Sequence, residues 1–174
     1  GLGVGWMKEE FDALGVPWEK RGARNDEYIE AMRALWQGPH AEYHGDFVDF
    51  EPATCSPRPV NGSIPVIVGG DSDAAISRAV RIADGYFPGE GDIAQLGALL
   101  DRVRQAAEAA GRDPASIEFS AIFGSQMANP EQGVEEMASI GVDRIMVPAF
   151  FFGGPDGLDN LDQLSERIMP IANG

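Results

Sequence analysis

The residues with the clearest chemical use lie where a short apolar run ends in two glycines and a helix is expected to begin. The segment VIVGGDSDAA, residues 66–75, contains Gly69, Gly70 and Ser72 at this junction. Glycine has no Cβ atom, so a ligand can approach its backbone closely. The first turn of a helix offers free N–H groups and the positive end of the helix dipole. Together these features favour a phosphate-binding turn, to which the Ser72 hydroxyl can add a donor.

The same segment leaves other interpretations open. A tight strand-to-helix turn that binds nothing explains the two glycines equally well. Asp71 and Asp73 count against a phosphate, unless they face solvent or cap the helix. Asp71 and Ser72 are both suitable N-cap residues, because their side-chain oxygens can accept a first-turn N–H.

A second glycine-rich stretch opens the chain, with Gly3, Gly5 and Trp6 in the sequence GVGW. Glycines at the end of a strand permit a flat ligand to lie against the backbone. The stretch is not the dinucleotide-binding GxGxxG pattern, because the third glycine is missing. A plain strand-to-loop turn is the simpler explanation.

Arg21, Arg24 and Tyr28 stand at the beginning of an expected long helix. A guanidinium at this position can bind a phosphate through paired N–H donors. The alternative is an ordinary solvated first turn, in which Asn25 or Asp26 caps the helix.

The remaining polar residues give no catalytic assignment. His40 and His44 lie in a loop that contains proline and glycine, without the carboxylate–histidine spacing of a metal site. No Gly-x-Ser-x-Gly nucleophile motif is present. We therefore expect no metal and assign no catalytic acid or base.

The composition restricts the function classes. The 174 residues carry 28 acidic against 13 basic side chains, for a net charge of -15. This charge argues against binding to nucleic acid or to an anionic membrane surface. The single cysteine cannot form an internal disulfide, which fits a reducing cytoplasm. No apolar run approaches the ~20 residues of a transmembrane helix, and no signal peptide is visible.

Short apolar runs alternate with amphipathic helical patterns, which predicts βα units and a parallel sheet. Strands are expected at residues 1–5, 64–68, 85–88, 117–123 and 142–151. Helices are expected at residues 7–14, 24–36, from 72 onward, 92–110, 130–140 and 158–168, with a hairpin at 40–52. Periodicity alone does not distinguish a (β/α)8 barrel from an open doubly wound sheet.

Several motifs, in this order and spacing, resemble the luciferase-like monooxygenase family over nearly the whole chain. They are GVGWMKEEF at 3–11, LGVP at 14–17, RGAR at 21–24 with Glu27 and Tyr28, YHG at 43–45, VGGxS at 68–72, ADGY at 83–86 and AAGRDP at 109–114. The resemblance implies an α/β fold, a (β/α)8 TIM barrel in which the five expected strands are strands 4 to 8. Residues 1–174 would then form a single domain, the C-terminal portion of the barrel. Because the chain begins with Gly1 inside an expected strand, we expect strands 1 to 3 to precede it.

The family uses flavin mononucleotide (FMN) or its deazaflavin analogue, coenzyme F420, and the resemblance places cofactor contacts in three groups. They are Gly69, Gly70 and Ser72 at the phosphate, Gly5, Trp6 and Met7 beside the ring, and Arg24 and Tyr28 near the phosphate or ribityl chain. The WMKEEF segment, residues 6–11, favours F420 over FMN as the cofactor.

The expected function is therefore hydride transfer between F420, or FMN, and a small organic substrate. One alternative is an FMN-dependent monooxygenase that uses reduced flavin and oxygen. Others are a non-catalytic fragment and a different phosphate-binding barrel or doubly wound enzyme. We expect a homodimer for the full-length protein.

Overall fold

Four parallel strands form one sheet in the order β3-β4-β5-β6, which is also their order along the chain. The computed structural model describes residues 1–89 and 91–172. The strands are β3 (Ile67–Gly69), β4 (Gly85–Phe87), β5 (Glu118–Ile122) and β6 (Arg144–Met146). Parallel strands that follow one another in the sequence and pair in the sheet need a crossover connection between them. The alternation of strand and helix patterns in the sequence predicted this arrangement.

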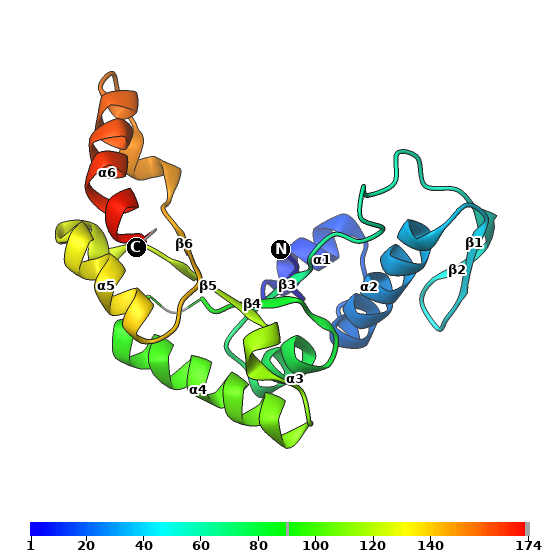
Figure 1. The fold of residues 1–174 in the computed structure, drawn as a ribbon. Coiled ribbons are helices and arrows are strands. Elements are labelled where there is room, and N and C mark those ends of the chain that lie inside the picture. The colour runs from blue at the N-terminus through cyan, green and yellow to red at the C-terminus, as the bar shows by residue number, and fades with distance from the viewer. Residues whose placement is uncertain (90, 173–174) are drawn as a thin grey trace.

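A helix follows each of these strands. They are α3 (Asp73–Ile82), α4 (Ile93–Ala109), α5 (Pro130–Ser139) and α6 (Gly157–Ala172), with short 3₁₀ turns η1 (Pro114–Ser116), η2 (Ser125–Ala128) and η3 (Ala149–Phe152). Figure 1 shows α3, α4 and α5 along one side of the strands. No helix in the described part of the chain is both long enough and apolar enough to cross a membrane.

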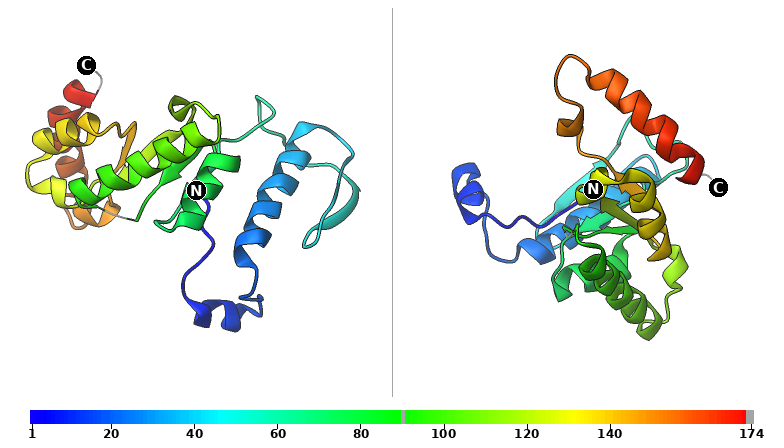
Figure 2. Two further views of the ribbon diagram at one scale, coloured as in Figure 1. Left: turned by 90° about the horizontal axis from the view of Figure 1, so that it is seen from below. Right: turned by 90° about the vertical axis from the view of Figure 1, so that its left-hand side faces the viewer.

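The N-terminal part adds two helices and a hairpin. They are α1 (Lys8–Leu14), α2 (Arg21–Gln37), β1 (Ala41–His44) and β2 (Asp49–Ala53). Before α1, Leu2 forms an isolated parallel bridge with Val68, so the chain start lies beside β3. Viewed from below, α1, α2 and the hairpin lie on one side of the sheet, and α5 and α6 on the other (Figure 2).

Side-chain alternation along the strands divides the sheet into two faces. Val68, Tyr86 and Phe119 are buried together with apolar residues of the helices that cover this face, such as Leu96 and Leu100 of α4. Burying such a side chain stabilises the fold by about 1.5–3 kcal/mol. On each strand, the residues directly before and after these point to the opposite face, where the candidate site lies.

Ion pairs attach α2 to the next βα unit. The carboxylate of Asp26 accepts from both Arg78 and Arg81 of α3. Arg33 donates to Asp84 over 2.9 Å. The idea that Asn25 or Asp26 caps the helix is wrong: α2 begins at Arg21 with Lys20 as N-cap, and Asp26 serves as the anchor to α3.

All five expected strands are shorter than the apolar runs suggested, and the strand expected at residues 1–5 is reduced to the isolated bridge of Leu2. The run at 142–151 forms β6 over only three residues and then turns into η3. Pro148 directly precedes η3, and a residue without an N–H cannot continue a ladder. The run at 64–68 enters β3 only at Ile67, after Pro65, and the strand ends one residue beyond the run, at Gly69.

Candidate functional site

Gly69, Gly70 and Ser72 form the turn from β3 into α3, called here the diglycine corner. The Gly69 N–H donates to the carbonyl of Leu2 over 2.9 Å, and the Gly70 N–H donates to that of Phe87 over 3.2 Å. Gly70 has a φ of +116°, a conformation that residues with a side chain rarely adopt. A Cβ atom at Gly69 would lie 3.3 Å from the Phe87 carbonyl oxygen. The backbone of the corner therefore favours glycine at position 70, and a side chain at position 69 would fit only tightly.

The helix that follows presents free amides at its first turn. Ser72 is the N-cap, and its hydroxyl oxygen accepts the Ala75 N–H over 3.2 Å. The N–H groups of Asp73 and Ala74, at the first two positions of α3, have no acceptor within the helix. The Ser72 hydroxyl keeps its own proton to donate. This set of donors at the positive end of a helix is suited to an anion.

The two acidic residues of the corner have partners of their own. Asp71 accepts the Gly89 N–H over 2.8 Å, so it joins the loops after β3 and β4. Asp73 is 95% exposed and pairs with Arg102 of α4. The sequence argument against a phosphate, which depended on where these two side chains point, is weakened accordingly.

Tyr86 of β4 stabilises the diglycine corner through a hydrogen bond. It is fully buried, and its hydroxyl donates to the Gly70 carbonyl oxygen over 2.8 Å. Burial raises the pKa of Tyr86 to about 12, the Asp71 charge adds to the shift, and Arg102 opposes it. The phenol therefore stays a donor at neutral pH. Sequence reasoning missed this role, although a buried tyrosine generally needs a hydrogen-bond partner.

The face of the sheet opposite the helices carries a cavity of about 490 Å³, called here the concave cavity. Its lining consists of Gly1, Leu2, Gly3, Pro65, Ile67, Gly69, Phe87, Glu118, Ser120, Arg144 and Met146. Gly69 belongs to both the cavity and the diglycine corner. In a TIM barrel this face is the interior, which is packed with side chains, so the part of the cavity suited to a ligand is the end beside the diglycine corner, near Gly69, Phe87 and Met146.

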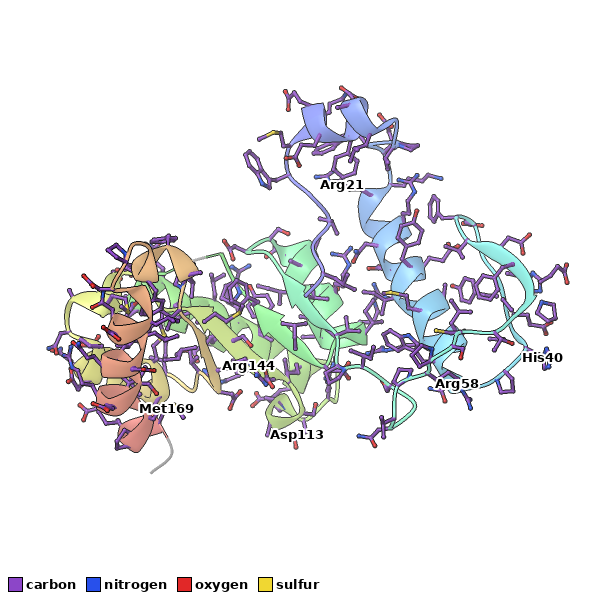
Figure 3. The ribbon with its side chains drawn as sticks, turned by 90° about the horizontal axis from the view of Figure 1, so that it is seen from above. Arg21, His40, Arg58, Asp113, Arg144 and Met169 are labelled. Atoms are coloured by element: carbon purple, nitrogen blue, oxygen red, sulfur yellow. The ribbon has the colours of Figure 1, made fainter. Side chains whose placement is uncertain are left out.

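One ion pair lies in the wall of the concave cavity, between the neighbouring strands β5 and β6. Arg144 of β6 donates through Nε and Nη2 to both carboxylate oxygens of Glu118, over 2.7 and 2.9 Å, and Figure 3 labels Arg144 on the sheet. Ser120 also donates to Glu118, over 3.1 Å. Pairing with Arg144 lowers the pKa of Glu118, and the pKa of Arg144 is raised in turn. Glu118 begins β5, so the pair lies toward the end of the sheet remote from the corner.

The predicted ring contacts lie in the loop before α1. Gly5 has a φ of +78°, and a Cβ atom there would lie 2.5 Å from the Phe11 ring. Trp6 is 81% exposed, and Met7 is the N-cap of α1. Neither Trp6 nor Met7 lines the concave cavity. Their contact with a cofactor stays a prediction.

Arg24 and Tyr28 lie together in a separate cavity of about 190 Å³, called here the arginine cavity. It is lined by Gly3, Val4, Phe11, Val16, Arg21, Arg24, Asn25 and Tyr28. Gly3 also lines the concave cavity, so the two cavities share this one residue. The lining of the arginine cavity does not include the residues of the diglycine corner. The structure thus separates the sequence candidates into three groups: the diglycine corner, the loop before α1, and the arginine cavity with Arg24 and Tyr28.

The histidines show no metal-site geometry. His44 Nδ1 lies 2.6 Å from Asp49 across the hairpin. Within residues 1–89 and 91–172, no group of three or more His, Cys, Asp or Glu side chains is placed to hold a metal ion.

Comparison with known proteins agrees with this architecture. A family model described as "Luciferase-like monooxygenase" matches residues 1–165. An uncharacterised protein of Mycobacterium tuberculosis is 36% identical over 181 residues, which cover 97% of this chain and 60% of that protein. The FMNH(2)-dependent dimethylsulfone monooxygenase of Pseudomonas putida is 37% identical over 111 residues, covering 62% of this chain and 31% of that enzyme. This chain thus spans less than two thirds of the length of these relatives.

Solved structures share the fold at low sequence identity. The F420-dependent tetrahydromethanopterin reductase of Methanopyrus kandleri gives a TM-score of 0.75 at 17% identity, covering 97% of this chain and 72% of that one. An F420-dependent secondary alcohol dehydrogenase gives a TM-score of 0.70 at 15% identity, covering 93% of this chain and 67% of that one. With its parallel sheet and βα order, the chain belongs to the luciferase-like monooxygenase family and has the corresponding part of its TIM-barrel fold.

Proposed function

We propose that this protein is an oxidoreductase that holds the phosphate of coenzyme F420 at the diglycine corner and acts on a small organic substrate. The observation that carries the proposal is the corner itself: two closely packed glycines, of which Gly70 has a φ of +116°, followed by free first-turn amides and the Ser72 hydroxyl. Because the chain covers 60% of the length of its M. tuberculosis relative, the activity is proposed for the whole protein. Its homodimeric state is likewise a proposal.

The residues present fit a phosphorylated cofactor. The N–H groups of Asp73 and Ala74 and the Ser72 hydroxyl would hold the phosphate. Phe87 and Met146, the last residues of β4 and β6, would contact the ring and keep water from one side of it. A bound deazaflavin supplies the hydride donor or acceptor. Tyr86 and Asp71 would keep the corner in shape by their bonds to Gly70 and Gly89.

A second candidate is an FMN-dependent monooxygenase. The 37% identity to the FMNH(2)-dependent dimethylsulfone monooxygenase of P. putida favours it, over residues that make up 62% of this chain. FMN carries a phosphate on the same ribityl chain, so the corner suits either cofactor. The F420 proposal draws on the WMKEEF segment and on the two F420-dependent enzymes of the same fold, whose low identities support only the fold.

Cofactor titration separates the two candidates. The purified protein is titrated with oxidised F420 and with FMN, and the quenching of each cofactor's own fluorescence is measured. We expect saturable binding of F420 at micromolar concentration and weaker binding of FMN. Tighter binding of FMN would favour the monooxygenase, and absence of binding to either cofactor would contradict both.

A further inference from the structure

Two carboxylates and one guanidinium determine the charge around the diglycine corner. Asp71 and Asp73 belong to the turn itself, and Arg102 of α4 pairs with Asp73. Arg102 thereby compensates one of the two negative charges, whereas Asp71 has no ion-pair partner among the described residues. The corner therefore has one uncompensated negative charge beside its N–H donors.

The Asp71 carboxylate is fixed in this position by the loop after β4. It accepts the Gly89 N–H over 2.8 Å, and a Cβ atom at Gly89 would lie 3.2 Å from its Oδ2 atom. The charge of Asp71 also acts on the hydroxyl of Tyr86, which donates to the Gly70 carbonyl. Burial raises the pKa of Tyr86 to about 12, the Asp71 charge adds to the shift, and the smaller effect of Arg102 opposes it. The field of Asp71 thus reaches the corner and exceeds that of Arg102 there.

The donors of the corner are neutral groups. They are the N–H groups of Asp73 and Ala74 and the hydroxyl of Ser72, at the end of α3 where the helix dipole supplies about half a positive charge. Residues 69–75 contain no lysine or arginine. Arg24 lines the arginine cavity, whose lining does not include the corner. Since a doubly charged phosphate is best bound by charged donors such as guanidinium groups, this set suits a single negative charge better.

The corner is also open on its outer side, since residues 71–74 are all exposed. A phosphate monoester ends at its phosphate, but a phosphodiester continues on both sides of it. The exposed turn leaves room for a chain that continues beyond the phosphate.

We propose that the diglycine corner selects a phosphodiester, with its single negative charge, over a phosphate monoester, and that Asp71 determines this selectivity. The inference rests on the proposed function, because it takes the corner as the phosphate site. A phosphate monoester has a charge of about −1.5 to −2 at pH 7 and a second pKa of about 6. Repulsion by Asp71 therefore acts on it about twice as strongly as on a diester. F420 carries a diester and FMN a monoester, so the corner would favour F420.

The test uses FMN, because pH alone changes the charge of its phosphate. Binding of FMN and of riboflavin, which lacks the phosphate, is measured by quenching of flavin fluorescence at pH 8.0 and at pH 5.5. The ratio of the two affinities isolates the phosphate, and riboflavin is the reference for protonation of the two histidines at the hairpin. Both pH values lie above the ordinary aspartate pKa of about 3.9. We expect the FMN-to-riboflavin affinity ratio to be at least about threefold higher at pH 5.5.

Two variants assign the effect to Asp71. Asp71→Asn removes the charge and keeps an oxygen that can accept the Gly89 N–H. At pH 8.0 its affinity for FMN should rise severalfold, and by more than its affinity for F420, while the affinity ratio should depend less on pH. Asp162→Asn is the matched control. It removes the same charge from an exposed position on α6, away from the corner (Figure 1), and should behave as wild type.

Three results would overturn the proposal. One is an affinity ratio above one that is as high at pH 8.0 as at pH 5.5, which would show that the corner accepts the doubly charged monoester and would leave the proposed phosphate site in place. Another is a pH dependence that Asp71→Asn does not change, which would remove the role of Asp71. The third is FMN binding no tighter than riboflavin binding at either pH, which would contradict the proposed function itself together with this inference.

Discussion

The hydroxyl of Tyr86 donates a 2.8 Å hydrogen bond to the carbonyl oxygen of Gly70. A buried side chain of β4 thereby fixes the turn that follows β3, sixteen residues earlier in the chain. The Asp71 carboxylate makes a second link, to the Gly89 N–H beyond β4. The diglycine corner is thus held by two neighbouring strands and does not depend on its own sequence alone.

Replacing Tyr86 by Phe should loosen the corner without disturbing the core. The ring keeps its packing, but the partly buried Gly70 carbonyl loses a donor, so the free energy of unfolding should fall by about 1 kcal/mol. Urea denaturation measures this change. Affinity for FMN should fall more than affinity for riboflavin, which lacks the phosphate. Equal losses for both ligands would mean that Tyr86 does not position the phosphate site.

Gly70→Ala should impair the corner by backbone strain. At a φ of +116°, the new methyl group would also lie 3.3 Å from the Cβ atom of Ala75. We expect a loss of about 1–3 kcal/mol in the free energy of unfolding, together with weaker cofactor binding. Gly111→Ala is the matched control, since Gly111 has a φ of +72° and open space around it. It should lose stability and keep its cofactor affinity.

The Glu118–Arg144 pair predicts a specific response to acid. Because pairing lowers the pKa of Glu118 in the folded protein, its contribution to stability is complete above the ordinary carboxyl pKa of about 4.3. The contribution disappears as the pH falls through the lowered pKa. Glu118→Gln should therefore be less stable than wild type at pH 7 and lose less stability on acidification below about pH 4.3.

The midpoint of urea denaturation, followed from pH 7 to pH 3, checks this prediction. Glu108→Gln removes an exposed glutamate that has no ion-pair partner among the described residues, and it should follow the wild-type curve. A Glu118→Gln curve parallel to wild type across this range would show that the pair contributes no pH dependence.

Glu27 should be needed to attach the hairpin to α2. Its carboxylate accepts the N–H groups of Phe47 and Val48, over 2.7 and 2.6 Å. Glu27→Ala leaves these partly buried donors without their acceptor, so a loss of about 2 kcal/mol is expected. Hydrogen exchange should become faster at the two amides and stay unchanged in α4. Unaltered protection at Phe47 and Val48 would contradict this role.

The parts of the fold that follow from local pattern were predictable. The βα order, the Ser72 cap, the hairpin at β1 and β2 and the helices α1 and α4 agree with the spacing of apolar residues and with cap residues. Strand ends were less predictable from apolar runs, because Pro148 and Pro65 shorten β6 and β3.

Contacts between distant segments could not be obtained from the sequence. The anchoring of Asp26 to Arg78 and the bond from Tyr86 to Gly70 depend on how α2 and β4 pack. The same is true of Arg24 and Tyr28, which line a cavity apart from the diglycine corner. Periodicity identifies the face of a helix, but the packing of the neighbouring elements decides what that face meets.

The central claim is that the diglycine corner holds the cofactor's phosphate, and one comparison of affinities tests it most directly. The protein is titrated with F420 and with the same deazaflavin lacking the phosphate and the tail beyond it, in wild type and in Gly70→Ala. We predict that wild type binds F420 at least about tenfold more tightly, and that Gly70→Ala removes most of this difference. Equal affinity of the wild-type protein for the two compounds would contradict the account.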